Sequence, residues 1–129
     1  MTALDRVAAA IARHRFRFDR ERDLQDGIAL ALEGASIGFR REVHLTTREA
    51  LASGLRAAGC IDFLVDGGVG LEVKIGGTLA AVTRQLHRYA HASGVDSLLL
   101  VTAKKALDRL PDALVGKPLR VVHLLGSAL

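Results

Sequence analysis

A Gly-rich turn between two short apolar runs constrains the fold of this chain more than any other feature. The turn is Asp-Gly-Gly at 66–68, and it predicts a β-hairpin with strands at about 60–66 and 69–75. Three charged residues stand inside these apolar strands: Asp62, Glu72 and Lys74. Burying a charged side chain is unfavourable unless it is paired or bound to a metal. The hairpin therefore predicts two paired strands of a β-sheet and a functional site on them.

The residues around the hairpin predict alternating helices and strands. Helices are expected at 2–16, from Asp19 as N-cap to Gly34, at about 47–57 behind a Thr46 capping box, and at about 78–92, with a helical turn at 104–109. Strands are expected at 37–45, 97–102 and 119–125. An irregular excursion would serve equally well at 46–58. A helix at 78–92 allows a crossover to a parallel strand, so the order predicts an α/β (α+β) fold with a mixed sheet and helices on both faces.

Length and composition indicate one globular domain over residues 1–129. Half of the residues are hydrophobic, which is enough for a real core. The net charge of +4 favours nucleic acid or another polyanion as a partner. Arginines gather at 13–22, with Phe16 and Phe18 between them. This run is either a solvated surface or, if it lines a cleft, a contact for the DNA backbone whose binding weakens as salt rises.

Cys60 is the single cysteine of the sequence. It excludes an intrachain disulfide and a Cys-rich zinc or iron–sulfur site, and we interpret it as a small core residue in a reducing, cytoplasmic setting. No apolar run approaches the roughly 20 residues of a membrane span. We expect no secretory signal and no membrane association.

The charged residues of the hairpin suit phosphodiester hydrolysis. This reaction needs an activated water and neutralised charge on the phosphorus centre, and a divalent metal supplies both. Mg²⁺ prefers oxygen ligands, so Asp62 and Glu72 on adjacent strands could share one ion, with the Val73 carbonyl as a third ligand. Lys74 points to the same face as Glu72 and could orient the water. The structural alternatives are an exposed polar face of an edge strand and an Asp62 paired with an arginine.

The series Asp62, nine residues, then Glu72-x-Lys74 resembles the D…(D/E)xK core of the PD-(D/E)XK nuclease superfamily. Upstream, Glu21 is similar to the acidic residue that this family often carries on its first core helix. Downstream, Gln85-x-x-x-Tyr89 resembles the QxxxY motif of the RecB-type and lambda-exonuclease-like branch. The resemblance covers roughly residues 19–102. It implies a restriction-endonuclease-like αβββαβ core once the 46–58 excursion is set aside.

The resemblance implies Mg²⁺- or Mn²⁺-dependent hydrolysis of nucleic acid, with DNA favoured over RNA. It implies metal binding and catalysis by the acidic residues and the lysine, and a supporting role for the glutamine and tyrosine. The catalytic residues expected on this basis are Glu21, Asp62, Glu72, Lys74, Gln85 and Tyr89. Phosphate contacts are expected from Arg20, Arg22, Arg84 and Arg88, with plain solvent exposure as the alternative. A core this small offers little recognition surface, so a homodimer or a larger protein partner is expected.

Other interpretations stay open at this point. The same fold could serve as a non-catalytic nucleic-acid-binding or interaction subunit, or act on a small phosphorylated molecule, although no sequence feature indicates a closed pocket. Glu21 could instead stabilise its helix dipole. Glu42 could form a strand-end ion pair or extend the acidic site. His87 and His91 have the i, i+4 spacing of a zinc-binding helix but no third ligand, and we interpret them as surface residues facing away from the Gln85 side.

Overall fold

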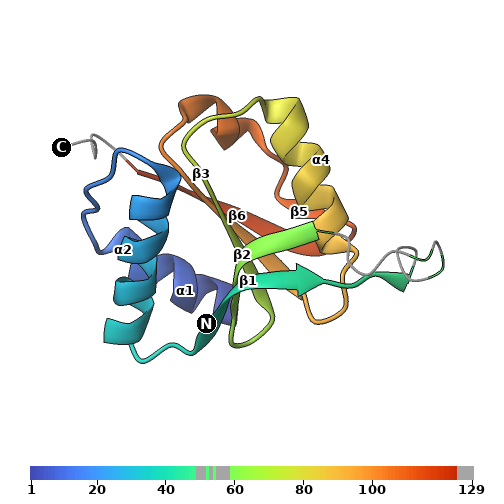
Figure 1. The fold of residues 1–129 in the computed structure, drawn as a ribbon, viewed down its shortest axis with the longest axis horizontal. Helices are drawn as coiled ribbons and strands as arrows, with labels where there is room; N and C mark the ends of the chain where they lie inside the picture. Colours follow the sequence, from blue (N-terminus) through green and yellow to red (C-terminus); the bar gives the residue numbers. More distant parts are fainter. Residues whose placement is uncertain (49–51, 53, 55–58, 125–129) are drawn as a thin grey trace.

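The computed structural model describes residues 1–48, 52, 54 and 59–124. Within these residues, the helices are α1 (Ala3–Ala12), α2 (Glu21–Gly34), α4 (Leu79–Ala90) and the 3-10 helix η1 (Lys105–Arg109). The strands are β1 (Phe39–Leu45), β2 (Gly59–Val65), β3 (Val69–Lys74), β4 (Ser97–Thr102), β5 (Ala113–Leu114) and β6 (Lys117–His123). The sheet lies between two helical layers, with α1 and α2 on one face and α4 on the other (Figure 1).

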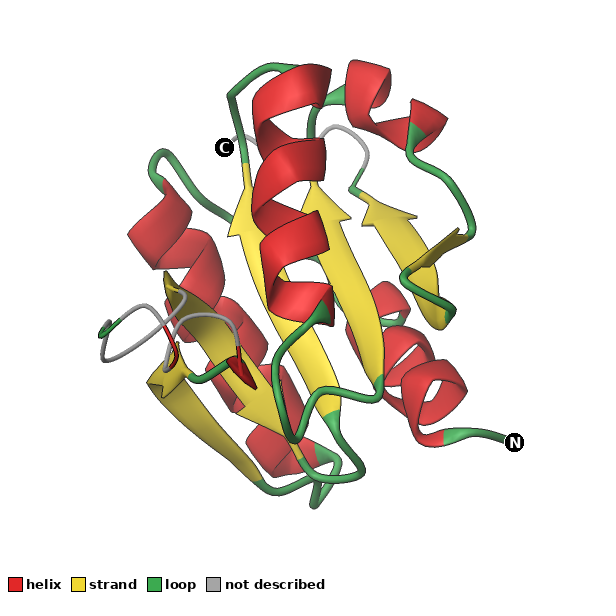
Figure 2. Cartoon of the chain, turned by 90° about the vertical axis from the view of Figure 1, so that its right-hand side faces the viewer, coloured by secondary structure: helices red, strands yellow, loops and turns green. Residues whose placement is uncertain are grey.

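The described strands form one mixed sheet of six strands in the order β1-β2-β3-β4-β6-β5. Strands β1, β2 and β3 pair antiparallel, whereas β3, β4 and β6 run parallel. Gly67 and Gly68, with φ of 92° and 76°, form the turn that joins β2 to β3, and α4 makes the crossover to β4. The predicted mixed sheet with helices on both faces is confirmed (Figure 2). The order α2-β1-β2-β3-α4-β4 is the predicted αβββαβ order.

The two faces of the sheet bury separate apolar clusters. Ile28 of α2 and Phe63 of β2 belong to the cluster under α1 and α2, and Leu86 of α4 belongs to the cluster on the opposite face. Strand β4 contributes Leu99 to the first cluster and Leu100 to the second. All six of its residues are buried, as its uninterrupted apolar sequence predicts for a central parallel strand.

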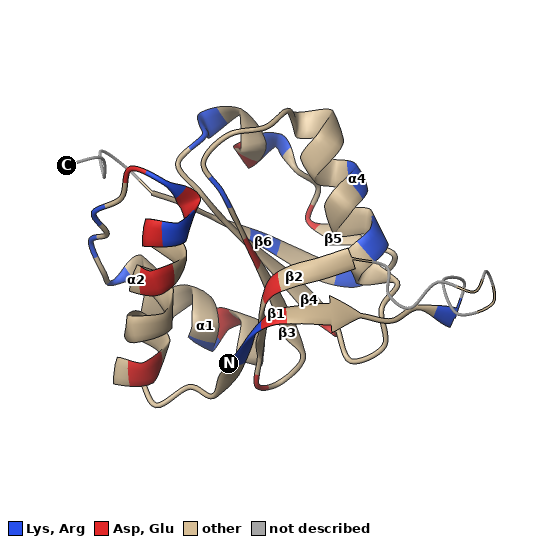
Figure 3. Cartoon of the chain, in the orientation of Figure 1, with Lys and Arg blue, Asp and Glu red and all other residues tan. Residues whose placement is uncertain are grey.

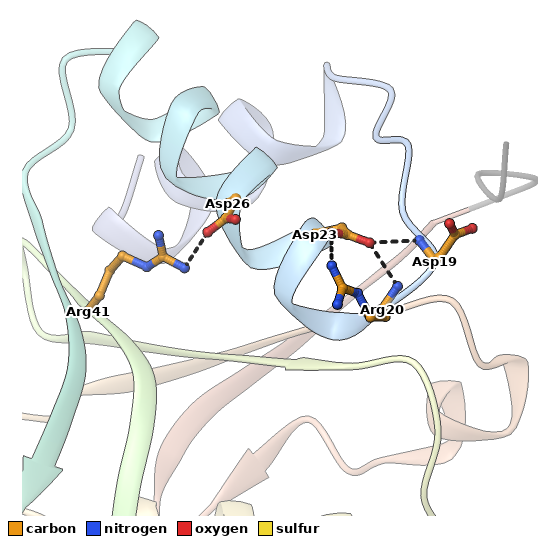
Figure 4. A network of polar contacts seen from close by, with 5 residues as sticks. All are labelled: Asp19, Arg20, Asp23, Asp26 and Arg41. Carbon is orange, nitrogen blue, oxygen red and sulfur yellow. Dashed lines mark hydrogen bonds and ion pairs between the residues drawn. The ribbon is translucent and has the colours of Figure 1, made fainter.

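Several predicted boundaries were wrong. Helix α1 ends at Ala12 rather than at residue 16, because Phe16 turns inward on a segment without helical structure. The N-cap of α2 is Arg20 rather than Asp19. The Asp23 carboxylate accepts the backbone N–H groups of both residues, at 3.1 and 3.2 Å, and so starts the helix one residue later (Figure 4).

The last strand, β6, covers 117–123 instead of the predicted 119–125, because it begins in a hairpin that the sequence did not reveal. The turn of this hairpin is Val115-Gly116, with φ of 52° and 73°, and valine is an unexpected residue at a positive φ. The helix predicted at about 47–57 falls largely outside the described residues. In the described part of the chain, no helix is long and apolar enough to span a membrane.

Candidate active site

Asp62 and Glu72 lie opposite each other at the point where β2 and β3 stop pairing. The backbone ladder between these strands ends at the pair Phe63–Leu71. Beyond it, Glu72 Oε1 accepts a hydrogen bond from the Asp62 N–H at 3.0 Å, and Asp62 Oδ2 accepts one from the Val73 N–H at 2.8 Å. Each carboxyl group therefore takes the place of a backbone acceptor that the separating strands no longer supply.

Burial and proximity couple the protonation of these two groups. The Glu72 side chain is almost fully buried; its burial and the adjacent Asp62 charge raise the pKa of Glu72 to about 8. Burial also raises the pKa of Asp62, although hydrogen bonds from the Val73 N–H and the Glu72 carboxyl act in the opposite direction. In the metal-free protein, burial and mutual repulsion therefore disfavour the doubly ionised state of the pair.

Lys74 is the last residue of β3 and connects the carboxyl pair to an open pocket of about 520 Å³. Its Nζ lies 3.7 Å from Glu72 Oε2, and 23% of its side chain is exposed, against 4% for Glu72. Glu72 and Lys74 alternate with Val73, so both project on the same side of the strand. The ammonium group therefore stands between the buried carboxyl pair and the solvent of the pocket.

Glu21 reaches the same pocket from the other side. It is the first residue of α2, lines the pocket, and accepts the Ile75 N–H at 3.2 Å just beyond the end of β3. Its negative charge is one of the causes that raise the pKa of Asp62. The structure thus places Glu21 at the end of β3, where it lines the same pocket as Lys74.

Gln85 and Tyr89 fasten α4 to β2 beside the carboxyl pair. Gln85 Nε2 donates to the Tyr89 hydroxyl at 2.9 Å, and that hydroxyl donates to the Cys60 carbonyl at 2.9 Å. Burial and the Glu72 charge raise the pKa of Tyr89, so the hydroxyl stays protonated. Gly59 permits this contact, because a Cβ there would lie 3.0 Å from the tyrosine ring. The prediction that Cys60 is a core residue was wrong, because Cys60 is exposed. Its backbone carbonyl accepts the hydrogen bond from Tyr89.

Glu42 has an unusual backbone conformation directly opposite Asp62. Its φ is 51°, in the left-handed region, and it lies between the register pairs Arg41–Phe63 and Val43–Ile61. On one side of this point Phe63 packs in the cluster under α1 and α2; on the other, Ile61 packs in the cluster under α4. The β1–β2 ribbon therefore turns over at Glu42 and Asp62. A left-handed glutamate inside a strand leaves no signal in the sequence.

The arginines predicted to contact phosphate differ in their surroundings. Arg84 and Arg88 are exposed and line a second open pocket of about 570 Å³ along α4, which adjoins the first at shared lining residues. Arg20 lines the first pocket but forms an ion pair with Asp23, at 3.4 Å (Figure 4). Arg22 is exposed without lining either pocket.

The carboxyl groups of Asp62 and Glu72 are the donors that the structure brings together for a cation, and Val73, whose carbonyl is the third predicted ligand, donates its N–H to Asp62. Among the described residues, no group of three or more His, Cys, Asp or Glu side chains is placed to hold a metal ion. One or two carboxylates completed by water and phosphate oxygens are nonetheless the usual ligands of Mg²⁺. Two adjacent buried carboxyl groups, whose pKa values are raised by burial, fit that group chemically. His87 and His91 are exposed with ring centroids 4.9 Å apart, on the surface as predicted.

Together these features define a mixed α/β domain with a carboxyl pair and a lysine on two interior strands of its sheet, and a glutamate of α2 near the end of β3. Comparisons of this chain with protein-family models, with curated proteins and with solved structures gave no match.

Proposed function

We propose that this chain is a metal-dependent nuclease of the PD-(D/E)XK type that hydrolyses phosphodiester bonds in nucleic acid, with DNA as the favoured substrate. The observation that carries the proposal is the convergence of Asp62, Glu72 and Lys74 where β2 and β3 separate, with Lys74 lining an open pocket. The resemblance of the sequence motifs supports the same conclusion.

Each residue has a distinct role in this proposal. Asp62 and Glu72, with the Val73 carbonyl, hold Mg²⁺ or Mn²⁺, which when bound supplies Lewis acidity and an activated water. A bound cation would lower the pKa of Glu72, because its positive charge would offset the burial and the Asp62 charge that raise it. Lys74 orients the water and offsets phosphate charge at the mouth of the pocket. Glu21 assists from α2.

Gln85 and Tyr89 act through position. Their hydrogen bonds hold α4 against the strand that bears Asp62, and Gln85 also lines the pocket. Arg84 and Arg88 supply positive charge along the adjoining pocket. These two open pockets favour a polymer that passes through the site over a small phosphorylated molecule that would need to be enclosed. The small recognition surface favours action as a homodimer or beside a larger protein.

The test is a cleavage assay with linear and circular DNA, single- and double-stranded, and with RNA, in Mn²⁺, Mg²⁺ or EDTA. We expect cleavage that depends on metal and falls by about 10² or more in Lys74→Ala, the range seen when one preorganised electrostatic donor is removed. Lys105→Ala removes an exposed lysine on η1 and is the matched control. Equal cleavage by the Lys74→Ala variant would refute the role of this lysine.

One observation favours a second candidate, a non-catalytic nucleic-acid-binding module. Both carboxyl groups already accept backbone N–H groups, so they have a structural task that needs no metal. Such a module would bind DNA equally well in EDTA and in Mn²⁺, would not cleave it, and would gain no thermal stability from either metal.

A further inference from the structure

We infer that Arg13, Arg15 and Arg17 form a phosphate-binding row that holds the nucleic-acid backbone beside the cleavage site. The inference rests on the proposed function and extends it to a surface outside the pocket. All three arginines are exposed, and they occupy the connection between α1 and α2. Figure 3 shows this connection as a loop with basic segments along its outer side.

Buried aromatic side chains fix the arginines in place. Phe16 and Phe18 alternate with Arg15 and Arg17 and are 7% and 8% exposed, packed in the cluster under α1 and α2, whereas Arg13 is the C-cap of α1. Phe16 lies so close to α2 that a Cβ on Gly27 would be 2.9 Å from its ring. The alternation over residues 15–18 has the period of an extended chain, which places Arg15 and Arg17 about 7 Å apart on one side. A row of this kind suits a linear polyanion. The packing of the phenylalanines fixes the backbone of the row before a ligand binds.

The charge of the row is uncompensated. None of these three arginines forms an ion pair with the residues that the structure describes, whereas Arg20 and Arg41 are both paired to aspartates. A guanidinium group presents a planar fork of donors that matches a phosphate. Unpaired arginines held by aromatic anchors are therefore available to a phosphate without the loss of an existing contact.

The row leads to the candidate active site. Two residues beyond Arg17 the chain reaches 19–21, which form one wall of the pocket that contains Lys74. Arg84 and Arg88 stand along the adjoining pocket on α4. A nucleic-acid strand that crosses the site would thus meet positive charge on both flanks, and the row would contribute to affinity without touching the reacting phosphate.

The test compares Arg15→Ala/Arg17→Ala with Arg6→Ala/Arg40→Ala, which removes two exposed arginines near the β2–β3 turn, at the opposite end of the sheet. Binding to labelled duplex DNA is measured by anisotropy in EDTA over a range of salt. We expect the slope of log K against log salt to become less steep by about 1.8 in the first variant, at about 0.9 per lost phosphate contact, and to stay unchanged in the second. In the cleavage assay KM should rise while kcat is retained.

The outcomes separate the two proposals. If the wild-type protein binds and cleaves DNA and the Arg15→Ala/Arg17→Ala variant has the same slope, the row is refuted and the nuclease stands. An equal loss in both double variants would also overturn the row, because it would show a general effect of charge. Binding to vesicles of anionic lipid without binding to duplex DNA would assign the row to a membrane and refute this inference. If the wild-type protein neither binds nor cleaves nucleic acid, both proposals fail.

Discussion

Replacing Glu72 by glutamine tests the electrostatics of the carboxyl pair without requiring a substrate. The glutamine keeps an acceptor oxygen for the Asp62 N–H but cannot ionise. A carboxyl whose pKa is raised by folding contributes stability at low pH, and this contribution is lost as the pH rises through the folded-state pKa. In the absence of metal, the wild-type protein should therefore lose stability as the pH rises from about 4.5 to about 8.

The size of the effect follows from the two pKa values. Folding raises the pKa of Glu72 from 4.5 to about 8. At about 1.36 kcal/mol per pKa unit, this difference corresponds to at most about 5 kcal/mol in the free energy of unfolding. About 3 kcal/mol of this would already be lost at pH 7. Domains of this size are stable by about 5–15 kcal/mol, so the effect is a large share of the total.

The assay is urea denaturation of the wild-type protein and Glu72→Gln between pH 4.5 and 9, in EDTA and in Mn²⁺. In EDTA the free energy of unfolding of the wild-type protein should fall, relative to that of the variant, by several kcal/mol as the pH rises. At pH 8, Mn²⁺ should restore the stability of the wild-type protein and leave that of the variant unchanged. Glu33→Gln, on the exposed face of α2, is the control and should follow the wild-type curve. Parallel pH curves for the wild-type protein and Glu72→Gln would refute the raised pKa of Glu72.

Two further substitutions test the supports of the site. Tyr89→Phe leaves the Cys60 carbonyl and the Gln85 amide without their partner and should lower the free energy of unfolding by about 1–3 kcal/mol in urea denaturation; an unchanged midpoint would contradict the network. Glu42→Gly should keep or raise stability, whereas Glu42→Val should lower it by about 1–2 kcal/mol or more, because only glycine adopts a positive φ freely. If glycine destabilises and Glu42→Gln does not, the side chain rather than the backbone of Glu42 is what matters.

The sequence predicted the sheet well because its signals were local. The Gly-Gly turn and the alternating residues of β3 predicted the hairpin. The apolar run at 97–102 predicted a central strand, and its bounds match those of β4. Predictions failed where a side chain overrode the local pattern. Phe16 ended α1 early by packing into the core, and Asp23 moved the cap of α2 to Arg20. Both effects depend on contacts that propensity does not report.

The candidate site shows the same division between residue type and environment. Charged residues inside apolar strands indicated that Asp62 and Glu72 are special, but not that each accepts a backbone N–H of the other strand. That arrangement requires β2 and β3 to separate just where the carboxyl groups stand, and it coincides with the left-handed Glu42 on the neighbouring strand. Because the β1–β2 pair twists at this point, Ile61 and Phe63 face opposite sides of the sheet. Asp62, between them, packs in neither apolar cluster and accepts a hydrogen bond from β3. Placement of the carboxyl pair is therefore a property of three strands together, and the conformation of Glu42 is as much a part of the site as the residues that carry the charge.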